Sequence, residues 1–295
     1  MANFCETDYQ FHYFGEFVNT VSNLAYIYFA LYPASRLWDT VTRRPLKAQN
    51  SLSENPRPTR QHDKVIWDSH TISLVLVGIT SGLFHATLHA LPQWLDETSM
   101  YLLGGSFAYS VLITKYDTTP SPIKDNRDNH QRTQRIAHHD RRLVFLSLFF
   151  VLSITSLVSR YTGNLDIHSL TFGLLLVGSG IKMIYLIFIF QPPPHLNIKT
   201  TFLGFSVTLA QRKMLISLVQ AGMLLHLAFT LWLIDCNPMF CGYLRHLRDE
   251  ILGNSGVGRG LGFLTELHGW WHVLTAAAAG KYIGLLRLLT TEAEA

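Results

Sequence analysis

Two histidines stand four residues apart in an otherwise apolar segment near the end of the chain, LTELHGWWHVL at 264–274. On an α-helix, residues four apart lie on one face, so His268 and His272 can direct two imidazole rings to a single point. Imidazole nitrogens bind zinc at about 2.0–2.1 Å, whereas burial of two such rings without partners costs roughly a few kcal/mol. The pair indicates a metal site; the alternative is a position in the aromatic belt where helices meet the membrane surface.

A second segment, GITSGLFHATLHALPQWLDETSM at 78–100, supplies further groups that could take part in hydrolysis. Ser81 and His85 are again four residues apart and therefore share one helical face. Pro92 marks a short turn, after which Asp96 is predicted to open the next helix as its N-cap or in its first turn. A serine, a histidine and an aspartate are thus expected at one boundary of the membrane.

A catalytic zinc ion takes three protein ligands and keeps a fourth position open for water. We predict that these ligands are His85, His268 and His272. Asp96 would accept a proton from the water, and Ser81 would donate a hydrogen bond to the oxygen on which negative charge develops. The arrangement indicates metal-assisted hydrolysis.

Simpler roles for the same residues stay open. His89 lies on the same stripe as His85 and is an alternative ligand, although it is nearer the end of the helix. Ser81 could bond a backbone carbonyl of its own helix, and Asp96 could serve only as a cap favoured by the helix dipole. Ionisable residues that face the interior of a membrane bundle are functional by default, which favours the catalytic roles.

Composition places these residues in a membrane protein. Hydrophobic residues make up 48% of the 295 residues and charged residues only 15%, well below the share of about 25% in soluble proteins. Apolar runs long enough to cross a bilayer core of about 30 Å predict a single all-α domain, 1–295. This polytopic bundle has seven expected transmembrane helices, at roughly 17–38, 65–88, 94–114, 142–160, 167–190, 213–234 and 262–288.

The basic residues predict the orientation of this bundle. The loops on one side, 40–64, 115–141 and 191–212, carry fourteen Lys and Arg residues, and those on the other side carry three. By the positive-inside rule the N-terminus is lumenal and the C-terminus cytosolic. The net charge of +4 then follows from topology and indicates no nucleic-acid partner. The first apolar run has no basic region before it, so we expect it to be retained and not cleaved.

Two further groups lie on the predicted lumenal side. Three cysteines occur there, at 5, 236 and 241, and because disulfides persist in this compartment we expect one bridge from the N-terminal segment to the loop 235–261. Glu6, Asp8 and Glu16 are carboxylates with no basic neighbour. With Asn3 and a backbone carbonyl they could hold a hard cation such as calcium, and the alternative is a solvated acidic tail.

Four segments together resemble the alkaline ceramidase family, seven-helix membrane amidases that cleave ceramides into a sphingoid base and a fatty acid. They are FCETDY, EFVNTVSNLAYI, GITSGLFHATL with QWLDETSM, and ELHGWWHVLT. The resemblance implies catalytic zinc on His85, His268 and His272, with Ser81 and Asp96 acting on the zinc water and the carbonyl oxygen. It also implies a ceramide substrate taken from the bilayer and a location in the endoplasmic reticulum or Golgi membrane.

The same resemblance assigns roles to the N-terminal residues. It implies a disulfide between Cys5 and Cys241, which leaves Cys236 free. It further implies a structural calcium ion whose ligands are Asn3, the carbonyl of Phe4, Glu6, Asp8 and Glu16.

A receptor of the progestin and adiponectin type is the alternative from another functional class. Such receptors resemble this chain in placing a serine, an aspartate and three histidines around zinc. The N-terminal block CETDY with EFVNTVSN and the lumenal N-terminus favour the amidase. In the amidase interpretation, Tyr26, Tyr28 and Phe29 of the first span would line part of the lipid cavity; otherwise they face lipid.

Overall fold

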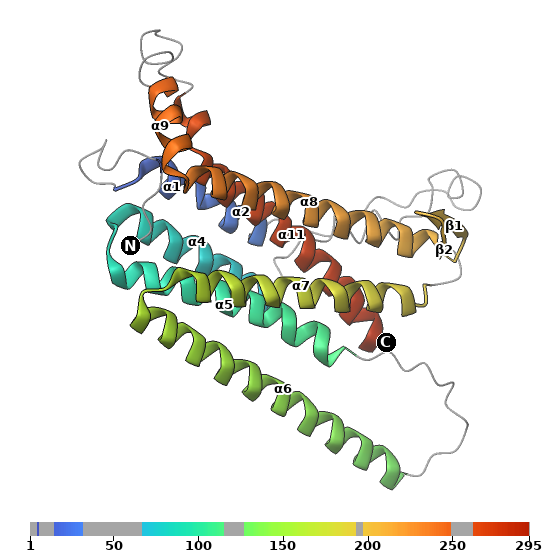
Figure 1. The fold of residues 1–295 in the computed structure, drawn as a ribbon. Helices are drawn as coiled ribbons and strands as arrows, with labels where there is room; N and C mark the ends of the chain where they lie inside the picture. Colours follow the sequence, from blue (N-terminus) through green and yellow to red (C-terminus); the bar gives the residue numbers. More distant parts are fainter. Residues whose placement is uncertain are drawn as a thin grey trace, which may run out of the picture.

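The computed structural model describes Cys5 and residues 15–31, 67–114, 127–192, 197–248 and 262–294, and α-helices predominate among them (Figure 1). The helices are α1 Phe17–Ser22, α2 Leu24–Leu31, α4 Ser69–Thr87, α5 Ala90–Ile113, α6 Arg127–Thr162, α7 Leu165–Ile189, α8 Leu209–Asp235, α9 Pro238–His246 and α11 Leu267–Glu294. Two antiparallel strands, β1 Lys199–Phe202 and β2 Phe205–Thr208, lie between α7 and α8, and a 3-10 turn, Gly262–Thr265, precedes α11. The prediction of a helical fold is confirmed for this part of the chain.

Five helical segments of the described chain are long and apolar enough to cross a membrane: Ser69–Thr87, Asp140–Thr162, Asp166–Ile189, Leu209–Asp235 and Leu267–Thr290. They coincide with five of the seven predicted spans. The first predicted span contains the shorter apolar stretch Phe17–Leu31, and the third coincides with α5, whose first half carries Gln93, Asp96 and Glu97. The count of seven spans and the orientation of the termini stay predictions.

Helix α11 runs through the middle of the bundle and packs against α8, α2, α4 and α5 (Figure 1). Of the apolar stretch of α11 that could cross a membrane, 61% is buried inside the protein, whereas the corresponding share for α6 is only 11%. Helix α6 is therefore peripheral and is held to α5 by a few polar contacts, among them the bond from Trp94 Nε1 to Ser156 Oγ at 3.0 Å. The residues of α11 are the ones best fixed by their surroundings.

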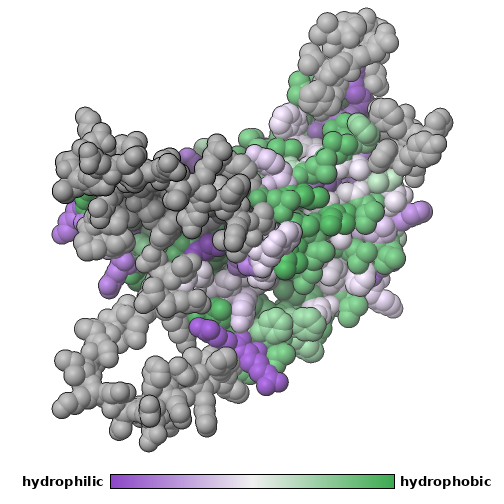
Figure 2. All heavy atoms as spheres, turned by 180° about the vertical axis from the view of Figure 1, so that it is seen from behind, coloured by the Kyte–Doolittle hydropathy of each residue, from purple (hydrophilic) through white to green (hydrophobic). Residues whose placement is uncertain are grey.

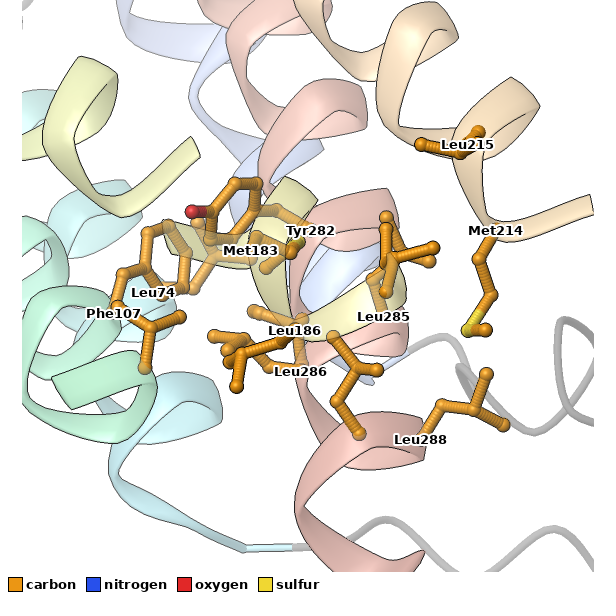
Figure 3. Packing of buried hydrophobic residues seen from close by; sticks show 14 of the residues in the cluster. Leu74, Phe107, Met183, Leu186, Met214, Leu215, Tyr282, Leu285, Leu286 and Leu288 are labelled. Carbon is orange, nitrogen blue, oxygen red and sulfur yellow. The ribbon is translucent and has the colours of Figure 1, made fainter. Parts of the chain in front are cut away.

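A large apolar core joins α4, α5, α7, α8 and α11 (Figure 3). Its best buried members include Leu74, Met183, Leu186, Met214, Leu285 and Leu286. Each of these side chains contributes about 1.5–3 kcal/mol when it leaves water. In a membrane this hydrophobic contribution is smaller, and close packing of side chains stabilises the bundle instead.

Large apolar side chains also cover the outside of the helices. Phe149 and Phe150 of α6 are 60% and 65% exposed, and Leu174 of α7 is 65% exposed. Figure 2 shows hydrophobic residues gathered over much of the described surface of one face. Monomeric soluble proteins rarely expose apolar patches of such extent, so the surface suits contact with lipid.

The helices that carry the predicted zinc ligands, α4 and α11, are joined at the ends remote from those histidines. Arg287 of α11 donates from Nε to Asp68 Oδ2 at 2.8 Å and from Nη2 to Thr71 Oγ1 at 2.5 Å. Asp68 is also the N-cap of α4 and accepts the Thr71 N–H at 2.8 Å. These contacts fix the position of the two helices along each other.

The C-terminal end of α4 is capped by the chain that leads into α1. The N–H groups of Gly15 and Glu16 donate to the carbonyls of Ala86 and His85, both at 2.9 Å. A Cβ on Gly15 would lie 2.6 Å from Leu88 Cγ and 2.9 Å from the His85 carbonyl oxygen, so only glycine allows this approach. Glu16 is thereby placed beside the last turn of α4.

Cys5 and Cys241 form a disulfide, the pairing that the family resemblance implies, and Cys236 is a free exposed thiol. The bridge ties the N-terminal segment to α9. Arg245 of α9 adds a hydrogen bond from Nε to the Cys5 carbonyl at 3.1 Å. The segment that precedes α1 is therefore held at both of its described points, Cys5 and Gly15.

We expect Cys241→Ser to lower the free energy of unfolding by about 2–4 kcal/mol, because the bridge closes a long loop. Thermal unfolding of the protein in detergent micelles, followed by circular dichroism, measures the change. Cys236→Ser is the matched control and should alter the stability by less than about 0.5 kcal/mol. Equal stability of the two variants would contradict the expectation.

Candidate functional site

Three histidine rings from two helices meet inside the bundle. His85 of α4 and His268 and His272 of α11 each place a ring nitrogen so that all three lie within 4.8 Å of one another. The ring centroids are 5.0, 4.9 and 4.6 Å apart, and no residue of the three is more than 4% exposed. Such a buried set of three imidazoles is the donor set of a catalytic zinc site, so the three residues fit the metal that the sequence predicts.

Two of the rings are oriented by hydrogen bonds from the far side. His85 Nδ1 lies 2.6 Å from Glu16 Oε2, and that oxygen also accepts from Asn19 Nδ2 at 3.0 Å. His272 Nδ1 lies 2.8 Å from Ser22 Oγ. Because each Nδ1 is occupied, Nε2 is the atom that each ring offers to a metal. A carboxylate behind a ligand histidine also raises its basicity.

The start of α11 is fixed by a carboxylate of another helix. Asp235, the last residue of α8, is 2% exposed and accepts the N–H of Cys5 at 3.1 Å and the N–H of His268. The first N–H groups of a helix have no partner within it, so Asp235 supplies one from outside. Glu266, directly before α11, forms an ion pair with Arg248. Together these contacts set where α11 begins and so where His268 points.

Ser81 and Asp96 lie in the same cavity as the three histidines. The Ser81 hydroxyl donates to the Asp96 carboxylate. One expectation about this pair is wrong: Asp96 does not open its helix, because α5 begins at Ala90 with His89 as its N-cap. Asp96 is therefore in the second turn and is no cap, and His89 lies beyond α4, outside the group of metal ligands. The pair and the three histidines therefore line one cavity.

The cavity has a volume of about 650 Å³ and is bounded by α4, α5, α7, α8 and α11. A second cavity of about 260 Å³ shares part of its wall, including Val77, Met100 and Phe172, and is almost wholly apolar. Of the three aromatic residues predicted to line the cavity, Tyr26 does so, whereas Tyr28 is 56% exposed on the outside. The combined space suits a ligand with a polar group and a long apolar chain.

The sequence identified some residues of this site and missed others. His85, His268, His272, Ser81 and Asp96 are brought together. The positioning roles of Ser22, Asn19 and Asp235 were not predicted, although the first two lie within the quoted segment EFVNTVSN. The acidic Asp235 at the end of an apolar span was the signal available for the third.

The calcium site stays a prediction. Asn3, Phe4, Glu6 and Asp8 lie outside the described residues. Glu16, its fifth predicted ligand, is 1% exposed and bonded to His85 and Asn19. Its Oε2 is thus engaged at the histidine cluster.

One protein family and several known proteins match this chain. The model of the Ceramidase family matches residues 1–295. Alkaline ceramidase YPC1 of Saccharomyces cerevisiae is 28% identical over 212 residues, which cover 70% of this chain and 57% of that protein. Alkaline ceramidase 3 of Mus musculus is 25% identical over 291 residues, which cover 98% of this chain and 82% of that protein. The putative alkaline ceramidase dcd3B of Dictyostelium discoideum is 24% identical over 283 residues, 95% of this chain and 83% of that protein. The match with the yeast protein thus spans little more than half of that protein's length.

We expect Glu16→Gln to weaken zinc binding about 10-fold to 100-fold, because the amide cannot support the His85 imidazole as the carboxylate does. Competition of the purified protein with a chromogenic chelator measures the affinity without any assay of activity. Asp166→Asn, which removes an exposed carboxylate from the first turn of α7, is the control and should bind zinc like the unmodified protein. Equal affinity of both variants would show that the contact with His85 does not serve the metal.

Proposed function

This chain belongs to the ceramidase family, and on that premise we propose that it hydrolyses the amide bond of ceramides to a sphingoid base and a free fatty acid, with zinc as its cofactor. The observation that carries the proposal is the convergence of His85, His268 and His272 in one cavity that Ser81 and Asp96 also line. The names of the three relatives support the reaction, since each is an alkaline ceramidase or a putative one.

The three histidines hold the metal in this proposal, through Nε2 in His85 and His272. A zinc ion in such a site would polarise a carbonyl and lower the pKa of water to about 7. Glu16 and Ser22 keep two of the rings in place from behind. The protein therefore provides the nucleophile at neutral pH without a strongly basic side chain.

Asp96 moves the protons of the reaction. Its carboxylate accepts a proton from the attacking water as the new C–O bond forms, and returns a proton to the amine nitrogen as the C–N bond breaks. In the substrate-free protein Ser81 donates to Asp96 and so orients it. When the amide is bound, the same hydroxyl turns to the carbonyl oxygen and stabilises its negative charge.

The walls of the cavity support a lipid substrate that arrives sideways from the bilayer. Leu170 and Val177 of α7 and Phe229 of α8 line the cavity, yet they are 65%, 61% and 44% exposed on the outside. The cavity thus opens between α7 and α8. A ceramide can pass this opening while its chains stay in apolar surroundings, and one chain can occupy the apolar second cavity. The location in the endoplasmic reticulum or Golgi membrane stays a prediction.

Purified protein should hydrolyse ceramides in mixed micelles, and a chelator should abolish the activity until zinc is restored. We expect His268→Ala to lose both the bound metal and the turnover, because it removes one of three ligands. Mass spectrometry of the released fatty acid and elemental analysis of the protein are the measurements. Undiminished hydrolysis by His268→Ala would exclude the proposed metal centre, and a zinc-loaded protein that cleaves no ceramide would favour the receptor class.

Ser81→Ala should lower kcat by roughly 10²-fold to 10³-fold, the usual loss on removal of one oxyanion donor, and should retain its zinc. Asp96→Asn should lower kcat by roughly 10²-fold to 10⁴-fold, because the amide cannot accept the proton. Thr87→Val removes a hydroxyl that bonds the Leu83 carbonyl of the same helix as Ser81 at 2.7 Å, and this variant should turn over normally. Single-turnover assays with a fluorescent ceramide distinguish a slower reaction from weaker binding.

A further inference from the structure

The cavity contains polar side chains that the proposed reaction does not use. Gln93 and Glu97 of α5 and His168 and Ser169 of α7 line it together with the histidine cluster. Polar groups beside a largely apolar space inside a helix bundle cost free energy unless they find partners. They are therefore candidates for contacts with the substrate.

Gln93 and Glu97 form one unit on the face of α5 that looks into the cavity. They are four residues apart, and Gln93 Nε2 donates to Glu97 Oε1 at 3.0 Å. Asp96 and Met100 line the cavity from the same helix. The hydrogen bond restrains the Glu97 side chain, so its carboxylate is held close to the reacting residue Asp96.

His168 lies at the start of α7 on another wall of the cavity. Its ring packs against Tyr101 of α5, with centroids 4.6 Å apart, and is stacked on Phe172 at 6.2 Å. The residue is only 7% exposed, and its Nδ1 has no hydrogen-bond partner among the residues that the structure describes. Buried polar atoms almost always have a partner, so this nitrogen points to a ligand.

The polar and apolar parts of the cavity wall follow each other along α5. Gln93, Asp96 and Glu97 occupy its first two turns, whereas Met100, Leu103 and Phe107 of the following turns line the apolar second cavity. A substrate that reaches both regions has a polar end and an apolar end. In a ceramide, the hydroxyl groups stand on carbon atoms next to the one that bears the amide nitrogen. When the amide of the substrate lies at Asp96, its hydroxyl groups therefore lie close to the residues beside Asp96, such as Glu97.

Resting on the proposed function, we propose that Glu97, supported by Gln93, and His168 form a subsite that binds the hydroxyl groups of the sphingoid base. The Glu97 carboxylate accepts a hydrogen bond from one hydroxyl, and the His168 imidazole bonds the other. Hydrogen bonds to an ionised partner are about twice as strong as neutral ones. The subsite thus selects hydroxylated sphingoid amides over simple fatty-acid amides and directs one chain toward Met100 and Phe107.

The test compares three substrates with one acyl chain: ceramide, its analogue without the C1 hydroxyl and its analogue without the C3 hydroxyl. The unmodified zinc enzyme should prefer ceramide to both analogues. Glu97→Gln keeps the shape and the bond from Gln93, and should lower kcat/KM for ceramide about 10-fold to 100-fold. It should leave kcat/KM for the analogue that lacks the recognised hydroxyl almost unchanged, so that the preference disappears.

His168→Phe keeps the ring between Tyr101 and Phe172 and removes both nitrogens. The His168→Phe variant should lose the preference for the other hydroxyl, which the Glu97→Gln variant still recognises. Asp166→Asn is the control, because it also removes a carboxylate but from an exposed position. It should keep all preferences. Zinc content and the midpoint of thermal unfolding, compared with the unmodified protein, show that each variant is folded.

Three results would overturn the subsite. The unmodified enzyme could cleave all three substrates equally well, or both variants could keep its preferences, or each variant could slow all substrates by one factor. The last result would mean that Glu97 acts on Asp96 or on the fold and not on a hydroxyl. A lack of any ceramide hydrolysis by the unmodified enzyme is a different outcome, because it refutes the proposed function itself and the subsite with it.

Discussion

The contact between Glu16 and His85 is the interaction on which the arrangement of the site depends. The Glu16 N–H caps the His85 carbonyl at 2.9 Å, and its carboxylate holds the His85 ring at 2.6 Å. One residue therefore terminates α4 and orients a ring on it. Because Glu16 also leads into α1, whose Ser22 contacts His272, a short N-terminal segment supports ligands on both α4 and α11. A carboxylate can be buried at this place only because these donors surround it.

The exterior of the bundle is apolar, and one half of its interior is polar. The large core is formed mainly by aliphatic and aromatic side chains, among them Leu74, Phe107 and Leu286 (Figure 3), whereas the other half contains the histidines, Ser81, Asp96 and Glu97. Helix α5 passes through both halves, and its polar first turns face the cavity and not the lipid. Stability is thus concentrated away from the reactive groups, which leaves the cavity open for a ligand.

The sequence indicated the parts of the site that follow from local periodicity. Spacing of four along a helix grouped His268 with His272 and Ser81 with His85, and the three ligands that catalytic zinc requires joined the two groups. The family resemblance implied the pairing of Cys5 with Cys241. Prediction from the sequence was wrong or incomplete where the position of a residue depends on contacts with another segment. Asp96 was placed at a helix start because Pro92 was taken as a turn, but proline is tolerated in the first turn of a helix, and α5 begins before it. No local pattern reveals that Asp235 bonds the N–H of His268, since that contact depends on how α8 and α11 meet.

The three histidines of the cluster are far apart in the chain, since His85 belongs to the second predicted span and the other two to the last. During synthesis, a ribosome that has delivered every helix up to α9 has still made only one of the three. The growing polypeptide thus has no complete centre until its final helix enters the bundle. A product that stops before α11 therefore lacks two of the three histidines on which the proposed function depends.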